Sequence, residues 1–389
     1  MQLDFYFISV IVFFIILGLA LYRDRKNLEV KYILIIRRSK KGLEIFDKIA
    51  KNSKFWKILG NIGILASLYL MIFGLVNLIA ISKAIIEGKI TGPTGGIVLP
   101  SPTSYTIFGP GYIAIPFWIW ITIVPIVIIP HEIFHGIMCR IERVKVKSFG
   151  FLLFGIFPGA FVEPDDNQIK KLKFFGKLRI FTAGSFVNFL VAMVLFVPFL
   201  NVGLIQNFIW PAFVEKGIYI TEINKTSPAY LSGIPSNSTL THINGKEVEI
   251  TYSDFLVGNY IHKYLDKSNL TKELVLTVNG QNYTVRPDEI KLGNITRPYL
   301  GIKSKLVVKT DEKFFFEFFI PLLTWMWIIN LAVAIVNILP IYPLDGGHVF
   351  KMFAEKITKK YQKELVWSAS LLTITLLIFT IIGPYIIKF

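Results

Sequence analysis

Several stretches of this 389-residue chain are long and apolar enough to cross a lipid bilayer, and they constrain its fold more than any other feature. A segment inside a bilayer must satisfy its backbone hydrogen bonds internally, so each stretch is predicted to be an α-helix. Hydrophobic residues make up 53% of the chain and aromatic residues 15%, which fits poorly with an ordinary soluble domain. The sequence therefore predicts a polytopic α-helical membrane protein with about six transmembrane helices. The stretches lie at about 5–22, 58–82, 112–139, 180–205, 314–339 and 365–387.

The positive charge of the chain is distributed unevenly. A formal net charge of +16 would suit a nucleic-acid partner, but the Lys and Arg residues cluster between the apolar stretches instead of along an aromatic basic face. We therefore expect no nucleic acid. Segment 23–57 contains twelve Lys and Arg, 140–179 nine and 351–363 five, whereas 83–110 contains two. The positive-inside rule then predicts a multi-pass cell-membrane protein with cytoplasmic basic loops and both termini outside.

Residues 206–311 differ from the rest of the chain and are predicted to form a small extracytoplasmic domain. They are polar, and alternating stretches at 217–223 and 273–278 favour β-strands. All five Asn-x-Ser/Thr sequons fall in this segment, which agrees with a location outside the cell. The sequons begin at Asn224, Asn237, Asn269, Asn282 and Asn294.

Residues 131–135, His-Glu-Ile-Phe-His, interrupt an otherwise uncharged apolar stretch. On a helix, His131 and His135 share one face and can bind one zinc ion, while Glu132 can accept a proton from zinc-bound water. Because Glu132 precedes Arg140 by eight residues, we expect it roughly 12 Å below the cytoplasmic surface. A pair of polar side chains packed between helices is the alternative, but ionisable residues at this depth usually serve function.

A catalytic zinc site needs a third protein ligand, and Asp345 is the best candidate in the sequence. Two prolines and two glycines surround it in Asn337-Ile-Leu-Pro-Ile-Tyr-Pro-Leu-Asp345-Gly-Gly-His348, and they should break the helix there. Broken backbone at membrane depth is tolerated where it lines a cavity. His348 is expected beside the site or at the interface. The single cysteine, Cys139, excludes an intrachain disulfide and a thiolate zinc cluster.

The paired motifs His131-Glu132-x-x-His135 and Leu-Asp345-Gly resemble those of the site-2 protease family of intramembrane zinc metalloproteases. Ala-Gly-Ser185-Phe-Val-Asn188 resembles another motif of that family, with Ser185 in place of its usual proline. Residues 149–166 resemble its membrane-dipping β-hairpin. The resemblance covers about 112–190 and 314–355, and it leaves the role of the first two spans open.

This resemblance implies roles for individual residues. His131, His135 and Asp345 would bind Zn²⁺, and Glu132 would act as general base and then as general acid. Asn188 and Asn337 would be candidates for hydrogen bonds to the substrate carbonyl or the tetrahedral oxyanion. For Asn188, an interhelical hydrogen bond is an equally plausible role.

Parts of segment 206–311 are similar to PDZ domains, which bind peptide termini by adding a strand to a sheet edge. Residues 227–234 and 243–248 are similar to a helix and a hairpin of that fold, with a predicted turn at Asn244-Gly245. Asn237, which tolerates a left-handed backbone, replaces the usual glycine. Residues 298–302 resemble a carboxylate-binding loop. A folded spacer without a ligand is the alternative for this α+β domain.

The expected function is hydrolysis of peptide bonds within transmembrane segments of other membrane proteins. Two alternatives stay open: a zinc-dependent membrane peptidase that acts on small or lipidated substrates, and a non-catalytic PDZ-containing receptor or metal transporter. We expect four segments: two N-terminal helices with a basic loop at 1–111, the first part of a catalytic core at 112–205, the PDZ-like domain at 206–311, and the second part of the core at 312–389.

Overall fold

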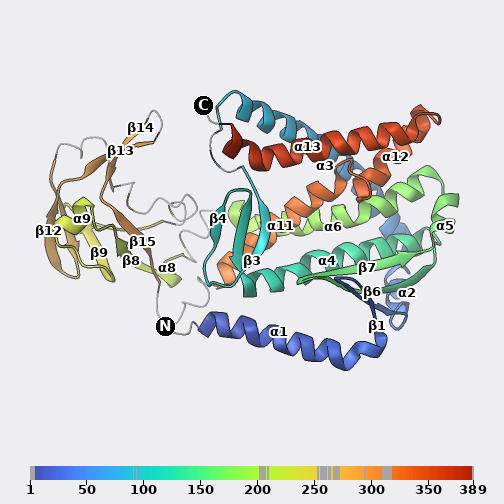
Figure 1. Ribbon diagram of the computed structural model, residues 1–389, viewed down its shortest axis with the longest axis horizontal. Coiled ribbons are helices and arrows are strands. Elements are labelled where there is room, and N and C mark those ends of the chain that lie inside the picture. Colours follow the sequence, from blue (N-terminus) through green and yellow to red (C-terminus); the bar gives the residue numbers. More distant parts are fainter. Residues whose placement is uncertain are drawn as a thin grey trace. The chain divides into compact units, whose positions relative to one another are not determined.

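The chain folds into two units, residues 1–195 with 321–389, and residues 196–320 (Figure 1). The two N-terminal helices, predicted as a segment of their own, belong to the same unit as the helices around the His-Glu-x-x-His motif. Sequons Asn269 and Asn294 lie outside the residues that the structure describes. This computed structural model describes all residues except 1–4, 91, 93, 201–206, 208–209, 252–253, 255–260, 262–263, 266–271, 293–294, 309–317 and 388–389.

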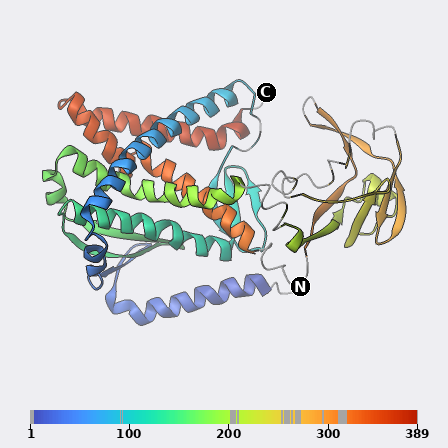
Figure 2. The same ribbon diagram turned by 180° about the vertical axis from the view of Figure 1, so that it is seen from behind.

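Six helices in the described residues are long and apolar enough to cross a membrane, and each overlaps one predicted stretch. The prediction of a polytopic helical membrane protein is therefore confirmed. In both views α1 lies at one margin of this unit, and α13 with the end of α3 lies at the other (Figures 1 and 2). The helices are α1 (Phe5–Asp24), α3 (Ser53–Ile86), α4 (Phe117–Ile141), α6 (Phe174–Leu200), α11 (Ile320–Ile338) and α13 (Gln362–Ile386), with the shorter α2 (Glu44–Ile49), α5 (Asp166–Lys171) and α12 (Asp345–Ile357) between them.

The first two spans are attached to the core by different contacts. Helix α3 approaches α6 closely, because Gly63 leaves space that the ring of Phe186 fills. Small residues permit such close contacts between membrane helices. Helix α1 contacts α4 through Phe13 and Phe117, whose ring centroids lie 5.1 Å apart. The Trp118 indole N–H also donates to Ser9 Oγ at 2.9 Å.

Two paired strands occupy the residues of the hairpin predicted at 149–166, and they belong to a larger sheet. That this hairpin dips into the membrane stays a prediction. The hairpin consists of β6 (Val146–Phe154) and β7 (Phe157–Pro164). Two further strands, β1 (Leu28–Lys31) and β2 (Leu34–Ser39), come from the basic segment after α1. Strand β1 pairs with β2 and β2 pairs with β6, which gives the order β1-β2-β6-β7. The sequence did not predict them, because their partner lies over a hundred residues away. Strand β7 is an edge strand and runs beside α4 (Figure 1).

A second sheet corrects the predicted span at 112–139. Residues 112–116 form a strand, and α4 begins at Phe117. Pro116 precedes the helix, and its backbone φ of −49° and ψ of 132° is extended, not helical. The strands are β3 (Ile97–Ser101), β4 (Ile107–Gly109) and β5 (Tyr112–Pro116) in the order β3-β5-β4, with β3 and β5 parallel.

The unit at residues 196–320 is an α+β domain built around one apolar core. The strands predicted at 217–223 and 273–278 are confirmed within β8 and β11. Its main sheet has the order β12-β11-β9-β8-β15, with β10 paired to β9 and a separate ribbon of β13 and β14. The elements are α8 (Trp210–Phe213), β8 (Val214–Ile223), α9 (Pro228–Leu231), β9 (Ser238–Ile243), β10 (Lys246–Glu247), β11 (Leu274–Val278), β12 (Gln281–Val285), β13 (Asp288–Leu292), β14 (Ile295–Tyr299) and β15 (Ile302–Val308).

The local turn predictions in this domain are confirmed. Asn244 and Gly245 have φ angles of +52° and +74° and join β9 to β10, as a tight hairpin turn requires. Asn237 has a φ of +56°, the left-handed conformation that asparagine tolerates. Gly301, with a φ of +75°, packs directly on Ser227, leaving no room for a side chain. The likeness to PDZ domains stays a prediction.

Candidate active site

The structure brings together the two histidines of the motif and the distant aspartate. His131 and His135 lie on one face of α4, with their Nε2 atoms 3.2 Å apart. Asp345, the first residue of α12, places its Oδ2 atom 3.3 Å from His131 Nε2 and 3.2 Å from His135 Nε2. The three side chains are largely buried, between helices that cross the membrane. This group is the predicted metal site.

The broken helix around Asp345 explains how the aspartate reaches α4. Helix α11 ends at Ile338, and α12 begins at Asp345. The chain between them folds back so tightly that a Cβ atom on Gly346 would lie 2.0 Å from the carbonyl oxygen of Ile338. Only glycine fits at that position. The predicted break is therefore confirmed, and it aims the first side chain of α12 at the two histidines.

Helix α6 supports both imidazoles from the other side. The backbone carbonyl of Ile180 lies 2.7 Å from His135 Nδ1, and the Asn188 amide lies 3.2 Å from His131 Nδ1. The atom facing Nδ1 is the amide nitrogen Nδ2, and the amide oxygen of Asn188 has no hydrogen-bond partner in the described residues. A 180° flip of the amide would let Asn188 accept the Nδ1 proton, and only this arrangement leaves Nε2 of His131 free for a metal. Gly184 is required here, because a Cβ atom would lie 2.3 Å from His131 Nε2.

The dimensions of this group fit a tetrahedral metal ion. Four donors about 2.0–2.1 Å from a zinc ion lie roughly 3.3 Å from one another. The three distances among the Nε2 and Oδ2 atoms are 3.2, 3.2 and 3.3 Å. The Asp345 Oδ2 atom is buried and has no hydrogen bond within the described part of the chain, so it is available as a ligand. Two neutral imidazoles and one carboxylate are a common donor set for catalytic zinc.

Glu132 is held by the edge strand of the hairpin sheet. Its Oε2 atom accepts a hydrogen bond of 2.9 Å from the backbone N–H of Val162 in β7. This contact holds the carboxylate of Glu132 in place, and Glu132 directly follows His131, the first proposed metal ligand, in α4. It also joins the proposed general base directly to the strand that runs beside α4.

The two-residue turn of the hairpin determines which groups of β7 face its open edge. Phe154 and Phe157 close the turn and form a hydrogen-bonded pair, and such pairs alternate along an antiparallel ladder. Ala160 and Val162 consequently direct their backbone N–H and C=O groups away from β6. The contact between Val162 and Glu132 agrees with this alternation. The Ala160 N–H and C=O and the Val162 C=O therefore point toward the open edge, beside Glu132.

The remaining predicted residues lie around this centre. Asn188 is fully buried and contacts His131. Asn337 is half-buried in the last turn of α11, eight residues before Asp345. His348 stacks on Phe181, with ring centroids 4.7 Å apart and nearly parallel planes. It is not among the metal-ligand group found in the described residues.

Sequence reasoning did not find the Val162 N–H or the Ile180 carbonyl as partners of the site. Both are backbone groups, which every residue type carries, so no residue pattern signals them. Gly184 was noted only as part of a family-like motif. Its physical role, to let α6 approach the His131 ring, follows from the crossing of the two helices.

A membrane-embedded helix with His-Glu-x-x-His, completed by a distant aspartate, defines a class of integral-membrane metalloprotease. The model of peptidase family M50 matches residues 119–381, and the chain belongs to this family, that of the site-2 proteases. The chain is also similar to an uncharacterized protein of Methanocaldococcus jannaschii, MJ0971. The two are 27% identical over 359 residues, which cover 90% of this chain and 87% of the relative.

Proposed function

We propose that this protein is a zinc-dependent intramembrane protease that hydrolyses peptide bonds within transmembrane segments of other membrane proteins. The observation that carries the proposal is the triangle of His131, His135 and Asp345, whose dimensions suit zinc, set within membrane-spanning helices. Membership of family M50 supports the peptidase activity. The apolar surroundings of the triangle favour substrates that lie in the bilayer.

Each polar side chain of the site has a proposed part in the reaction. Zinc, when bound by His131, His135 and Asp345, supplies a Lewis acid that lowers the pKa of water. Glu132 accepts a proton from the attacking water and later gives it to the leaving amide nitrogen. Asn337 is a candidate donor to the developing oxyanion. For Asn188, the contact with His131 Nδ1 favours a role in orienting that ligand.

The open edge of β7 is the proposed binding place for the substrate backbone. A transmembrane helix hides its carbonyl groups in internal hydrogen bonds, so it must unwind locally before water can attack. An unwound segment can pair with the outward N–H and C=O of Ala160. The next outward residue along β7 is Val162, which contacts Glu132. Pairing at Ala160 would therefore extend the substrate toward the proposed general base.

The domain at residues 196–320 is proposed to select substrates by binding a peptide terminus. Strand β15 is the edge of its main sheet and directly follows the turn at Leu300 and Gly301. This turn is held by hydrogen bonds from the N–H groups of Ala229 and Asn224. An added peptide strand on β15 is the PDZ-like mode of recognition. The charge pattern supports an extracytoplasmic place for this domain and for both termini.

The decisive experiment is cleavage of a single-span membrane protein by the purified full chain in liposomes. Wild-type protein with zinc is expected to cut within the span, and a chelator should stop cleavage. Glu132→Gln should lower the rate by about 10²–10⁴-fold while it still binds zinc. Equal cleavage by wild type and variant would overturn the mechanism. Faster cleavage of short soluble peptides than of the spanning substrate would instead favour the membrane-peptidase alternative.

A further inference from the structure

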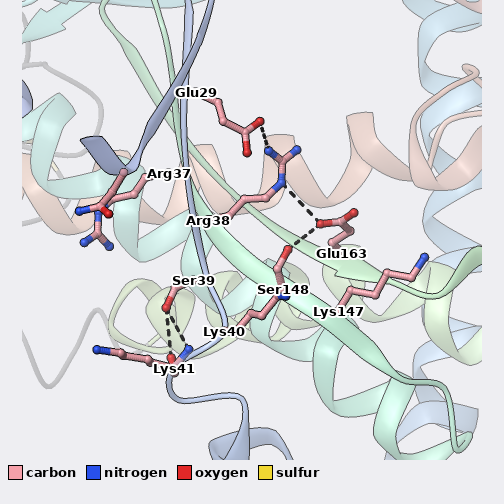
Figure 3. A pocket seen from close by; sticks show the side chains of 10 residues that line it. Glu29, Arg37, Arg38, Ser39, Lys40, Lys41, Lys147, Ser148 and Glu163 are labelled. Carbon is pink, nitrogen blue, oxygen red and sulfur yellow. Dashed lines mark hydrogen bonds and ion pairs between the residues drawn. The ribbon is translucent and has the colours of Figure 1, made fainter. Parts of the chain in front are cut away.

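A basic pocket lies on the sheet β1-β2-β6-β7, and none of the proposed metal ligands lines it. Its volume is about 790 Å³. Figure 3 shows that its side chains come from the segment after α1 and from both strands of the hairpin. It is lined by the cations Arg37, Arg38, Lys40, Lys41 and Lys147, the carboxylates Glu29 and Glu163, and the neutral residues Asn27, Ser39 and Ser148.

The two carboxylates of the pocket share one arginine, which compensates one of their two negative charges. Arg38 pairs with Glu29 through Nη1, and its Nε lies 3.6 Å from Glu163 (Figure 3). Glu163 also accepts a hydrogen bond of 2.5 Å from Ser148 Oγ. The hydrogen bond from Arg38 lowers the pKa of Glu29, so this carboxylate stays ionised and paired.

The lysines of the pocket have at most one long ion-pair contact among the described residues. In the part of the chain that the structure describes, Lys40 and Lys41 form no ion pair, and Lys147 only approaches Asp165 at 4.0 Å. All three are exposed. Three flexible ammonium groups around one concave site suit an anion with several oxygen atoms, because each ammonium offers three donors in adjustable directions.

The level of the pocket in the membrane follows from the elements around it. Asn27 lines the pocket three residues after α1 ends at Asp24, and Lys147 lines it six residues after α4 ends at Ile141. Two membrane-spanning helices thus leave the bilayer at this level. A site there faces the headgroups of the lipids that surround α1.

The opposite end of the same sheet exposes apolar side chains beside one cation, Lys31. The tips of the two hairpins expose Tyr32, Ile33 and Phe154 and are joined by a hydrogen bond from the Gly155 N–H to the Ile33 carbonyl. Strand β2 runs from this tip to Ser39, and six residues span roughly 20 Å. Half of the hydrocarbon core is about 15 Å thick. With its tip among the acyl chains, the sheet therefore places its basic end at headgroup level.

We propose that this pocket binds the phosphate group of an anionic phospholipid. The lysines supply the charge, and the ends of α1 and α4 place the pocket at headgroup level. Helix α1 exposes apolar side chains such as Leu19 and Tyr22, which offer a surface for the acyl chains. The sheet that carries the pocket also carries Val162, the partner of Glu132. A bound lipid would therefore hold the sheet at a fixed depth beside the active site.

Binding of phosphatidylglycerol to the detergent-solubilised full chain tests the proposal, with phosphatidylcholine as the neutral lipid and native mass spectrometry as readout. The triple variant Lys40→Gln, Lys41→Gln, Lys147→Gln should bind phosphatidylglycerol roughly fivefold more weakly for each lysine removed. The matched control removes Lys48, Lys51 and Lys54, which are exposed in the same basic loop but do not line the pocket. It should bind like wild type.

Three outcomes would overturn the proposal. Equal weakening by both triple variants would mean that only overall surface charge attracts the lipid. Competition by inorganic phosphate at the lipid's own concentration would identify a site for a free anion, and competition by an acidic peptide a site for a protein segment. Replacing the three pocket lysines by arginine should restore binding, which separates lost charge from misfolding. None of these readouts depends on proteolysis.

Discussion

The membrane unit buries polar side chains among its apolar ones far more often than the domain at residues 196–320 does. The domain core is apolar, with residues such as Ile218, Leu240 and Leu276 fully buried. The membrane helices also pack apolar side chains together, but they expose leucine and valine on their outer faces and bury polar residues between them. Among these are Ser67, Thr182, Ser185, Asn188, Asn330, Ser370 and Thr373. In the membrane unit, hydrophobicity therefore tells where the helices are but not which faces meet.

The physical reason is the solvent. Water drives apolar side chains together in the domain, whereas lipid tails are as apolar as leucine and exert no such force between helices. Contacts in the membrane unit depend on small residues that permit close approach and on hydrogen bonds between helices. The same contacts shape the active site, since Gly184 and Asn188 of α6 both touch His131.

Loss of Asp345 should have the largest effect and should separate function from folding. Asp345→Asn removes the carboxylate ligand and leaves the two imidazole ligands, while the side chain keeps its shape. We expect loss of bound zinc, measured by metal analysis, and loss of detectable cleavage, with an unchanged far-UV spectrum. Glu355→Gln, an exposed change in the same helix α12, is the control and should retain both. A zinc-replete, active Asp345→Asn protein would contradict the ligand assignment.

Paired leucine truncations test the contrast between the two solvents. Leu276 is fully buried in the domain core, and Leu371 on α13 is 68% exposed. Leu276→Ala should destabilise the domain by about 2–5 kcal/mol, because it leaves a cavity. Leu371→Ala should change stability by about 0.5 kcal/mol or less. Hydrogen exchange of the full chain measures both, and similar effects at the two positions would refute the contrast.

Asn188→Ala should weaken zinc binding by about 10–100-fold, the usual effect of losing the partner of a histidine ligand. Asn330 provides a matched control, because it is also fully buried in a membrane helix, and its amide donates to the Met326 carbonyl of its own helix. Asn330→Ala should leave zinc affinity unchanged. Competition with a fluorescent chelator measures both affinities. If Asn188→Ala lowers the rate at saturating zinc without weakening zinc binding, Asn188 contacts the substrate instead.

The smallest expected effect concerns the open edge of β7. Ala160→Pro removes one outward N–H without touching the bonds to β6, whereas Ala160→Val keeps that N–H. One lost hydrogen bond should slow cleavage of a spanning substrate by roughly tenfold. Cleavage assays of the two variants test whether the substrate pairs with β7 at Ala160. Identical rates would show that the substrate does not pair at Ala160, although β7 would still hold Glu132.

Prediction from sequence succeeded where the signal is local or where few residues can perform the chemistry. The helices follow from runs of apolar residues, and the turn at Asn244 and Gly245 follows from their tolerance of positive φ. His131, His135 and Asp345 were grouped because zinc accepts few ligand types, and the structure brings these three side chains together. The pairing of β2 with β6 could not be predicted, because strand pairing between distant segments leaves no local pattern. The start of α4 at Phe117 could not be predicted either. The preceding strand is as apolar as the helix, so no change in hydrophobicity marks the boundary.

The sequence by itself determined that the chain spans a membrane, which residues can bind a metal, and where a polar domain interrupts the helices. Each follows from the chemistry of single side chains in a known solvent. Only the tertiary structure decided that α6 supports both histidines, that Val162 holds Glu132, and that the segment after α1 completes the hairpin sheet. These contacts use backbone groups and close approaches between distant segments. Every residue carries the same backbone groups, so the sequence does not show which of them will meet. These contacts are therefore decided only when the chain folds.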